Sequence, residues 1–199
     1  MTQINYDKII HQKAVGERID YGLIFGNEKI VFIKCGAGGS IKGYQDKYIK
    51  LAHRIHLRIG ATVIVSSNPD VEHDLQISFD KTIISASAAF LGLKNHEVCF
   101  VGTSDGGYYV LLLAKHIPES VKYLGINPST PTEDKFIQKI KGLPQLEKFI
   151  AYGTEDELFD FVPKLQASDI PNLEIKILDG IDHEFTDKVD EFIGLTDLI

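Results

Sequence analysis

The sequence lacks several features that would assign it to a specialised class of protein. Only two of its 199 residues are cysteine, Cys35 and Cys99, and no C-x-x-C pair occurs, so a disulfide framework is not expected. No apolar run approaches the roughly 20 residues that a membrane-spanning helix requires. Residues 1–8 are polar and contain no signal-peptide core. These absences predict a cytoplasmic protein with two reduced, buried thiols and no membrane association.

Long basic runs are missing as well. The net charge is −7, and Lys and Arg alternate with Asp and Glu as they do on a solvated surface. Nucleic acid is therefore not an expected partner. We find no internal repeat, low-complexity tract or linker, and the 44% hydrophobic and 25% charged residues are ordinary for a globular protein. The sequence predicts one domain over residues 1–199.

Short apolar, β-branched runs alternate along the chain with segments in which apolar residues recur every three or four positions. The short runs predict strands at residues 6–11, 19–25, 30–34, 61–65, 98–101, 121–126, 148–152 and 173–178. The longer segments predict helices at residues 44–59, 78–91, 108–114, 132–140, 158–166 and 186–193. This alternation predicts an α/β protein: a mostly parallel twisted sheet of about eight strands with helices on both faces. The first two strands are expected to form an antiparallel hairpin at one edge.

The most informative segment is Gly102-Thr103-Ser104-Asp105-Gly106-Gly107, which lies between an expected strand and an expected helix. A G-x-S-x-G sequence in that setting predicts a nucleophile elbow, in which the serine hydroxyl stands above the end of the sheet. Gly102 and Gly106 would keep side chains out of the close approach between strand and helix. The positive end of the helix dipole would lie at Ser104, where it would stabilise negative charge on an attacked carbonyl oxygen.

A serine hydroxyl needs a base within hydrogen-bond reach, and the base needs a partner that fixes its tautomer. Asp156 and His183 each follow a later expected strand, so the sheet would bring them to the edge that carries Ser104. Glu155, Glu157 and Asp134 compete with Asp156 for the role of the acid. Ser104, Asp156 and His183 are the predicted nucleophile, orienting acid and base.

With these residues the chain resembles a small α/β-hydrolase over nearly its whole length. The resemblance rests on three segments: residues 102–107, Gly153-Thr154-Glu155-Asp156, and Gly180-Ile181-Asp182-His183-Glu184-Phe185. It implies an oxyanion hole made by the backbone N–H groups of Asp105 and Ala37, with Gly36 as the alternative to Ala37. The resemblance also favours Asp156 as the acid, because the family's acid follows the strand-ending glycine by about three residues.

The chain departs from the family pattern at two positions. Cys35 stands where the family often has a histidine before the oxyanion loop, although backbone donors are unaffected by that change. Asp105 places a carboxylate beside the nucleophile, where an uncharged side chain is more usual. This carboxylate either points away into solvent or raises the basicity of His183.

Other chemistry is disfavoured by the residues present. The loop at residues 36–43 is neither a dinucleotide fingerprint nor a P-loop, because Ile41 and Tyr44 stand where a glycine and a lysine are needed. His53 and His56 share a helix face but have no third ligand at a suitable spacing, so no metal is expected. Cys35 has no identifiable activating partner and is expected to be a structural thiol.

The expected function is that of a serine hydrolase that cleaves small soluble carboxylic esters or thioesters through an acyl-enzyme on Ser104, without a cofactor. The alternatives are a non-catalytic binding protein with the same fold and an amidase or peptidase with the same triad. The segment between the strands at 121–126 and 148–152 is too short for a separate lid domain. An open site is therefore expected, with Tyr108, Asn127 and residues 66–68 as its walls.

Overall fold

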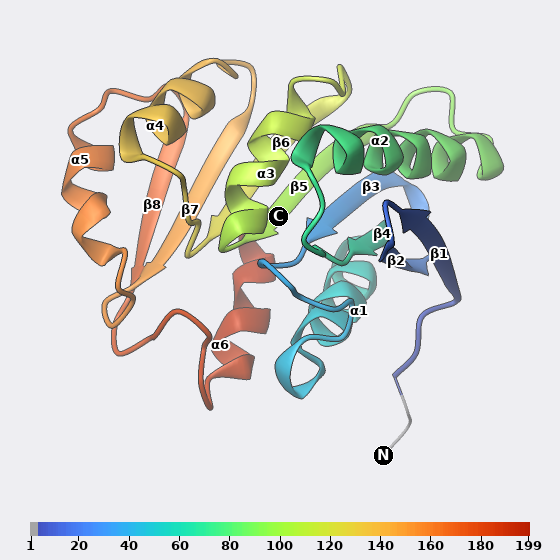
Figure 1. Cartoon of the computed structure of the whole chain (residues 1–199), viewed down its shortest axis with the longest axis horizontal. Coiled ribbons are helices and arrows are strands. Elements are labelled where there is room, and N and C mark those ends of the chain that lie inside the picture. Colours follow the sequence, from blue (N-terminus) through green and yellow to red (C-terminus); the bar gives the residue numbers. More distant parts are fainter. Residues whose placement is uncertain (1–3) are drawn as a thin grey trace.

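The structure is a computed structural model that describes residues 4–199. Its centre is an eight-stranded sheet in the order β1-β2-β4-β3-β5-β6-β7-β8 (Figure 1). The strands are β1 (Lys8–Ala14), β2 (Glu17–Ile24), β3 (Asn27–Lys34), β4 (Ala61–Ser66), β5 (Glu97–Thr103), β6 (Ser120–Ile126), β7 (Glu147–Gly153) and β8 (Leu173–Leu178). Strand β2 is antiparallel to both of its neighbours, and the pairs from β4 to β8 are parallel. The predicted mostly parallel sheet and its N-terminal hairpin are confirmed.

Helices cover both faces of this sheet (Figure 1). One face carries α1 (Lys47–Ile59) and α6 (Val189–Gly194), and the other carries α2 (His73–Phe90), α3 (Asp105–Ala114), α4 (Glu133–Lys141) and α5 (Val162–Gln166). Three 3₁₀ turns, at Tyr44–Asp46, Phe159–Phe161 and Leu195–Leu198, flank these helices. No helix within residues 4–199 is long and apolar enough to cross a membrane.

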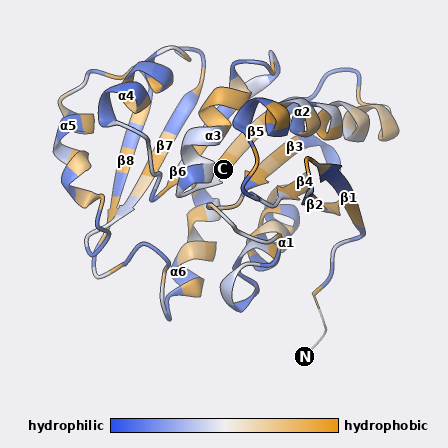
Figure 2. Ribbon diagram, viewed as in Figure 1, coloured by the Kyte–Doolittle hydropathy of each residue, from blue (hydrophilic) through white to orange (hydrophobic). Residues whose placement is uncertain are grey.

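The central strands are apolar on both faces because successive side chains of a strand point in opposite directions. On β3, Ile30 and Phe32 belong to the core cluster beneath α2 to α5, whereas Val31 and Ile33 belong to the cluster beneath α1 and α6. The central strands accordingly carry many hydrophobic residues in Figure 2. This double burial fixes the sheet between two helical layers.

Two helices begin later than their apolar spacing predicts. Helix α1 starts at Lys47 rather than at residue 44, because Gln45 and Asp46 have φ values of 49° and 60°, which a right-handed helix does not allow. The last helix starts at Val189 rather than at residue 186, since Phe185 and Asp187 also have positive φ values. In both cases the preceding loop borders the candidate site described below.

Two other helices differ from their predicted extent. Helix α2 begins at His73, five residues before the predicted start at residue 78, in a stretch whose polar residues hide the apolar spacing. The segment 158–166, predicted as one helix, divides into a 3₁₀ turn and α5, and Pro163 lies in the first turn of α5.

Candidate active site

Ser104 lies at the junction of β5 and α3, with φ 51° and ψ −127°. This conformation is unfavourable for a residue with a side chain, and it lifts the hydroxyl above the end of the sheet. A Cβ atom at Gly102 would collide with the backbone of Gly106, and a Cβ at Gly106 would collide with the carbonyl of Cys35. The two glycines therefore permit the close approach of β5, α3 and the loop after β3 that the elbow requires.

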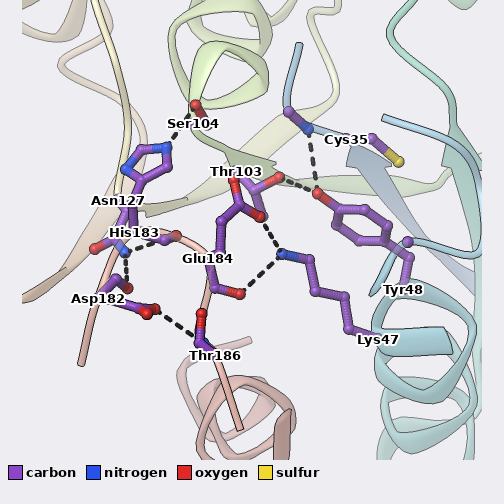
Figure 3. Close-up of polar contacts among 12 residues, drawn as sticks. Cys35, Lys47, Tyr48, Thr103, Ser104, Asn127, Asp182, His183, Glu184 and Thr186 are labelled. Carbon is purple, nitrogen blue, oxygen red and sulfur yellow. Dashed lines mark hydrogen bonds and ion pairs between the residues drawn. The ribbon is translucent and has the colours of Figure 1, made fainter. Parts of the chain in front are cut away.

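Three side chains that are distant in sequence form one hydrogen-bonded chain at the carboxyl edge of the sheet. Ser104 Oγ lies 2.9 Å from His183 Nε2 (Figure 3), and His183 Nδ1 lies 2.8 Å from Asp156 Oδ2. Ionised Asp156 can only accept, so Nδ1 carries the imidazole proton and Nε2 is free to accept the proton of the Ser104 hydroxyl. The arrangement matches the geometry of a nucleophile, a base and an orienting acid.

The environment of the triad supports these roles. The side chain of Asp156 is 0% exposed, and its other oxygen accepts a 2.7 Å hydrogen bond from the backbone N–H of Leu158. The side chain of His183 is 24% exposed, so solvent and a ligand can reach it. The hydrogen bond that His183 donates to the Asp156 carboxylate raises the pKa of His183 against the opposing effect of burial. A more basic imidazole is a stronger proton acceptor for the serine.

The sequence offers four acids as partners of His183, and the structure places Asp156 in contact with its imidazole. Glu155 and Glu157 are exposed on either side of Asp156. Asp134 instead forms an ion pair with Lys164 at 2.9 Å.

The loop after β3 lies against the elbow. The Gly36 N–H donates to the Tyr48 hydroxyl at 3.2 Å. The Ala37 N–H has no acceptor in the described part of the chain, so it is available to a ligand. The Asp105 N–H is the first of α3, a position that has no acceptor within the helix. Ala37 is therefore better suited than Gly36 to pair with Asp105 as an oxyanion donor.

A pocket of about 340 Å³ opens above Ser104, and we call it the Ser104 pocket. Its lining includes Ala37 and His183 beside Ser104, and Phe185 and Phe192 on the wall formed with α6. None of residues 128–146, which link β6 to β7, contributes to this lining.

Lys47 joins the pocket wall to the loop that carries His183 (Figure 3). Its Nζ donates to the backbone carbonyl and to Oε2 of Glu184, both at 3.2 Å, and its side chain is largely buried. The pattern of hydrophobic residues could not reveal this contact, because Lys47 lies at the start of an amphipathic helix where a lysine is normally solvated.

Asn127 and Tyr108, which the sequence predicts as pocket walls, do not line the Ser104 pocket. Asn127 is 1% exposed; its Nδ2 donates to the carbonyls of Asp182 and His183 at 3.1 and 3.2 Å (Figure 3), and its Oδ1 accepts from the Gly153 N–H at 2.9 Å. Asn127 thus fastens the end of β7 to the His183 loop. Its burial depends on strand order, which the sequence alone does not specify.

Tyr108 is buried against Phe136 of α4, on the face of the sheet covered by α2 to α5. The third predicted wall segment, residues 66–68, is buried as well, and the Asn68 amide donates to Asp105 Oδ2 at 3.0 Å. The Asp105 carboxylate makes a second contact with His73 Nε2 at 3.5 Å. The sequence leaves two positions open for this carboxylate, solvent or the neighbourhood of His183. The structure shows a third, in which the carboxylate contacts Asn68 and His73.

The remaining candidates from the sequence have ordinary structural surroundings. Burial raises the pKa of the Cys35 thiol well above its usual range, and Cys35 Sγ contacts the carbonyl of Ser40. Both cysteines are buried free thiols. The rings of His53 and His56 contact the backbone carbonyls of Asn5 and Ala61.

No family model and no curated protein matches the sequence significantly. Solved structures do match. A serine hydrolase homologue from Coxiella burnetii aligns with a TM-score of 0.72 at 14% identity, over 98% of each chain. A serine hydrolase without a lid from Xanthomonas campestris aligns with a TM-score of 0.69 at 14% identity, over 97% of this chain and 93% of the other. The thioesterase domain of the curacin biosynthetic pathway aligns with a TM-score of 0.69 at 11% identity, over 96% and 98%. Together with the sheet order, these similarities show the α/β-hydrolase fold.

Proposed function

We propose that this chain, which has the α/β-hydrolase fold, is a serine hydrolase that cleaves small soluble carboxylic esters or thioesters. The observation that carries the proposal is the unbroken hydrogen-bonded chain from Ser104 through His183 to Asp156. The fold alone would not suffice, because it hosts proteins with many functions and some without catalysis. A non-catalytic binding protein has no need for a strained serine aligned with a histidine that contacts a buried aspartate.

The proposed reaction proceeds through an acyl-enzyme. Ser104 Oγ attacks the carbonyl carbon of the substrate while His183 Nε2 takes the hydroxyl proton. The oxyanion accepts hydrogen bonds from the Ala37 and Asp105 N–H groups, which contribute about 2.7–4 kcal/mol each to the transition state. His183 then returns the proton to the departing alkoxide or thiolate as the carbon–oxygen or carbon–sulfur bond breaks.

Water completes the cycle. His183 accepts a proton from the water that attacks the acyl carbon, and the same proton returns to Ser104 Oγ when the acid product leaves. Asp156 holds the imidazole in the required tautomer in both halves of the reaction. These groups supply the nucleophile, the base and the oxyanion donors, so the proposed mechanism uses no metal and no cofactor.

The surroundings of the Ser104 pocket favour a small substrate. The segment between β6 and β7 forms α4, whose Phe136 and Ile140 are buried in the core away from the pocket. We therefore propose one domain without a separate lid. An open, partly polar pocket of about 340 Å³ suits short esters or thioesters. An amidase acting through the same triad is the alternative that substrate profiling would detect.

A fluorophosphonate probe tests the proposal, because it phosphonylates only a serine that a base activates. The wild-type protein is expected to become labelled, and labelling should be lost in Ser104→Ala. Ser168→Ala is the control, since Ser168 lies beyond α5 and its hydroxyl donates an exposed hydrogen bond to the carbonyl of Lys164. Labelling that survives in Ser104→Ala would reject Ser104 as the nucleophile, and absence of labelling in all three proteins would favour the non-catalytic alternative.

A further inference from the structure

A second pocket borders the loop after β3, which carries Ala37, and we call it the Asp105 pocket. It has a volume of about 300 Å³ and is lined by residues of the loop after β4, the start of α2 and the start of α3. Ala37 lines both this pocket and the Ser104 pocket. A substrate whose carbonyl oxygen is held at Ala37 can therefore extend into both.

The residues that line the Asp105 pocket have hydrogen-bond acceptors that no group of residues 4–199 uses. Asn68 and His73 both contact Oδ2 of Asp105, so Oδ1 accepts nothing from the part of the chain that the structure describes. The Asp105 side chain is 31% exposed. The His73 contact holds the pKa of Asp105 below its usual value, against the opposing effect of burial. The pocket thus carries a fixed negative charge at neutral pH.

Gln76 supplies the second, independent observation. It is 1% exposed and lines the same pocket, and its Oε1 has no hydrogen-bond partner among residues 4–199. Its Nε2 donates to the carbonyls of Pro69 and Val71, at 3.2 and 2.7 Å. Two carbonyls can only accept, so the orientation of the amide is fixed and Oε1 cannot exchange places with Nε2. A buried acceptor without a donor is costly, so a donor from a ligand would relieve that cost.

A third acceptor borders this pocket. Asp70 is exposed and contributes to the lining, so the residues that line the pocket carry two carboxylates and one unpaired amide oxygen. His73 is the only residue of the lining that can carry a positive charge, and it already contacts Asp105. A group with several donors and a positive charge, such as a primary ammonium, satisfies this set of acceptors.

We infer that the Asp105 pocket binds a primary ammonium or similarly donor-rich cation carried by the acyl part of the substrate. The assignment to the acyl part rests on the proposed function. The leaving group must lie against His183 Nε2 to receive its proton, and His183 lines the Ser104 pocket but not the Asp105 pocket. A substrate group that is bound in the Asp105 pocket therefore belongs to the acyl chain. The expected substrates are esters or thioesters of short amino acids whose amine is remote from the carbonyl.

The kinetic test compares the 4-nitrophenyl esters of 6-aminohexanoate and heptanoate, which have equal length and differ by an ammonium in place of a methyl group. The wild-type protein should favour the amino ester in kcat/KM by about tenfold, the gain expected from one charged hydrogen-bonded contact. Asp105→Asn should bring this ratio close to one, and Asp70→Asn should lower it about twofold because Asp70 is solvated. Asp179→Asn, which changes an exposed aspartate outside the pocket, is the matched control.

A binding experiment separates failure of this inference from failure of the proposed function. In a proton–nitrogen NMR titration, n-butylammonium should shift the Gln76 side-chain amide in the wild type, and Asp105→Asn should weaken this binding about tenfold. Equal hydrolysis of the two esters, together with no shift at Gln76, would overturn the inference while leaving the hydrolase intact. Equal hydrolysis with a shift would overturn the assignment to the acyl chain. A shift in a protein that hydrolyses neither ester would support the cation site and reject the proposed function.

Discussion

Asn127→Ala removes the side chain that fastens the His183 loop to the sheet. The change leaves the buried Gly153 N–H without an acceptor and the carbonyls of Asp182 and His183 without their donor. One buried unsatisfied group costs about 1–3 kcal/mol. The two carbonyls can recover water more easily than the buried N–H can, so we expect a loss of about 3 kcal/mol in the free energy of unfolding.

The same substitution should slow the reaction itself. Without Asn127 the imidazole loses its fixed position relative to Ser104 Oγ, and a misplacement of about 1 Å can cost about 100-fold in rate. We expect kcat for a 4-nitrophenyl ester to fall between about 10-fold and 100-fold. KM should change little, because Asn127 does not line the Ser104 pocket.

Asn172→Ala is the matched control for this experiment. Asn172 has φ 55°, close to the 43° of Asn127, but it is exposed and distant from the triad. Both variants therefore carry the strain of an alanine in a left-handed conformation. Asn172→Ala also loses one exposed hydrogen bond, from Nδ2 to the Pro144 carbonyl at 3.1 Å, so the difference between the variants reports the burial of the Asn127 contacts and their place beside His183. Urea unfolding and steady-state kinetics give the two readouts. Equal kcat values in the two variants would refute the positioning role of Asn127.

Three further predictions concern the triad and its support. Ser104→Ala and His183→Ala should each lower kcat by about 10³–10⁶, and the double variant should cost little more; additive losses would contradict a cooperating triad. Because the Asp156 contact raises the pKa of His183 and only the neutral imidazole acts as a base, kcat/KM should fall as the pH drops through a midpoint above the usual pKa of histidine. Asp156→Asn should move that midpoint to lower pH, and an unchanged midpoint would exclude the His–Asp contact as its cause. Lys47→Met should lower kcat by a fewfold, because it removes the contact that holds the His183 loop. Glu184→Gln should leave kcat near the wild-type value, because the Glu184 side chain is 68% exposed and solvent screens its ion pair with Lys47. Equal losses of kcat in the two variants would show that the ion pair, and not the contact of Lys47 with the backbone carbonyl, carries the effect.

The sheet was largely predictable because strands that are buried on both faces consist of continuous apolar residues. Ile30 to Ile33 form an unbroken apolar run, as expected of a strand covered on both faces, and such runs recur between helical segments. The elbow was predictable because its G-x-S-x-G sequence is local, and Gly102 is required by a close backbone contact with Gly106 four residues on, whereas the contact of Gly106 with the Cys35 carbonyl appears only in the structure.

What could not be predicted depends on contacts between distant segments. Asn127 follows β6, but its amide is bound by groups from β7 and the His183 loop, so its role follows from strand order. The late start of α6 results from the left-handed conformations of Phe185 and Asp187, which apolar spacing does not encode. The orientation of the Gln76 amide follows from the carbonyls of Pro69 and Val71, which accept from its Nε2, and apolar spacing does not encode this contact either.

The most direct test of the account is to observe the acyl-enzyme. The wild-type protein is mixed with 4-nitrophenyl heptanoate, quenched in acid within milliseconds to seconds, and digested for mass spectrometry. We predict a heptanoyl group on the peptide that contains Ser104, appearing with a burst of 4-nitrophenolate. Hydrolysis at a normal rate with the acyl group on another residue, or labelling that persists in Ser104→Ala, would contradict it.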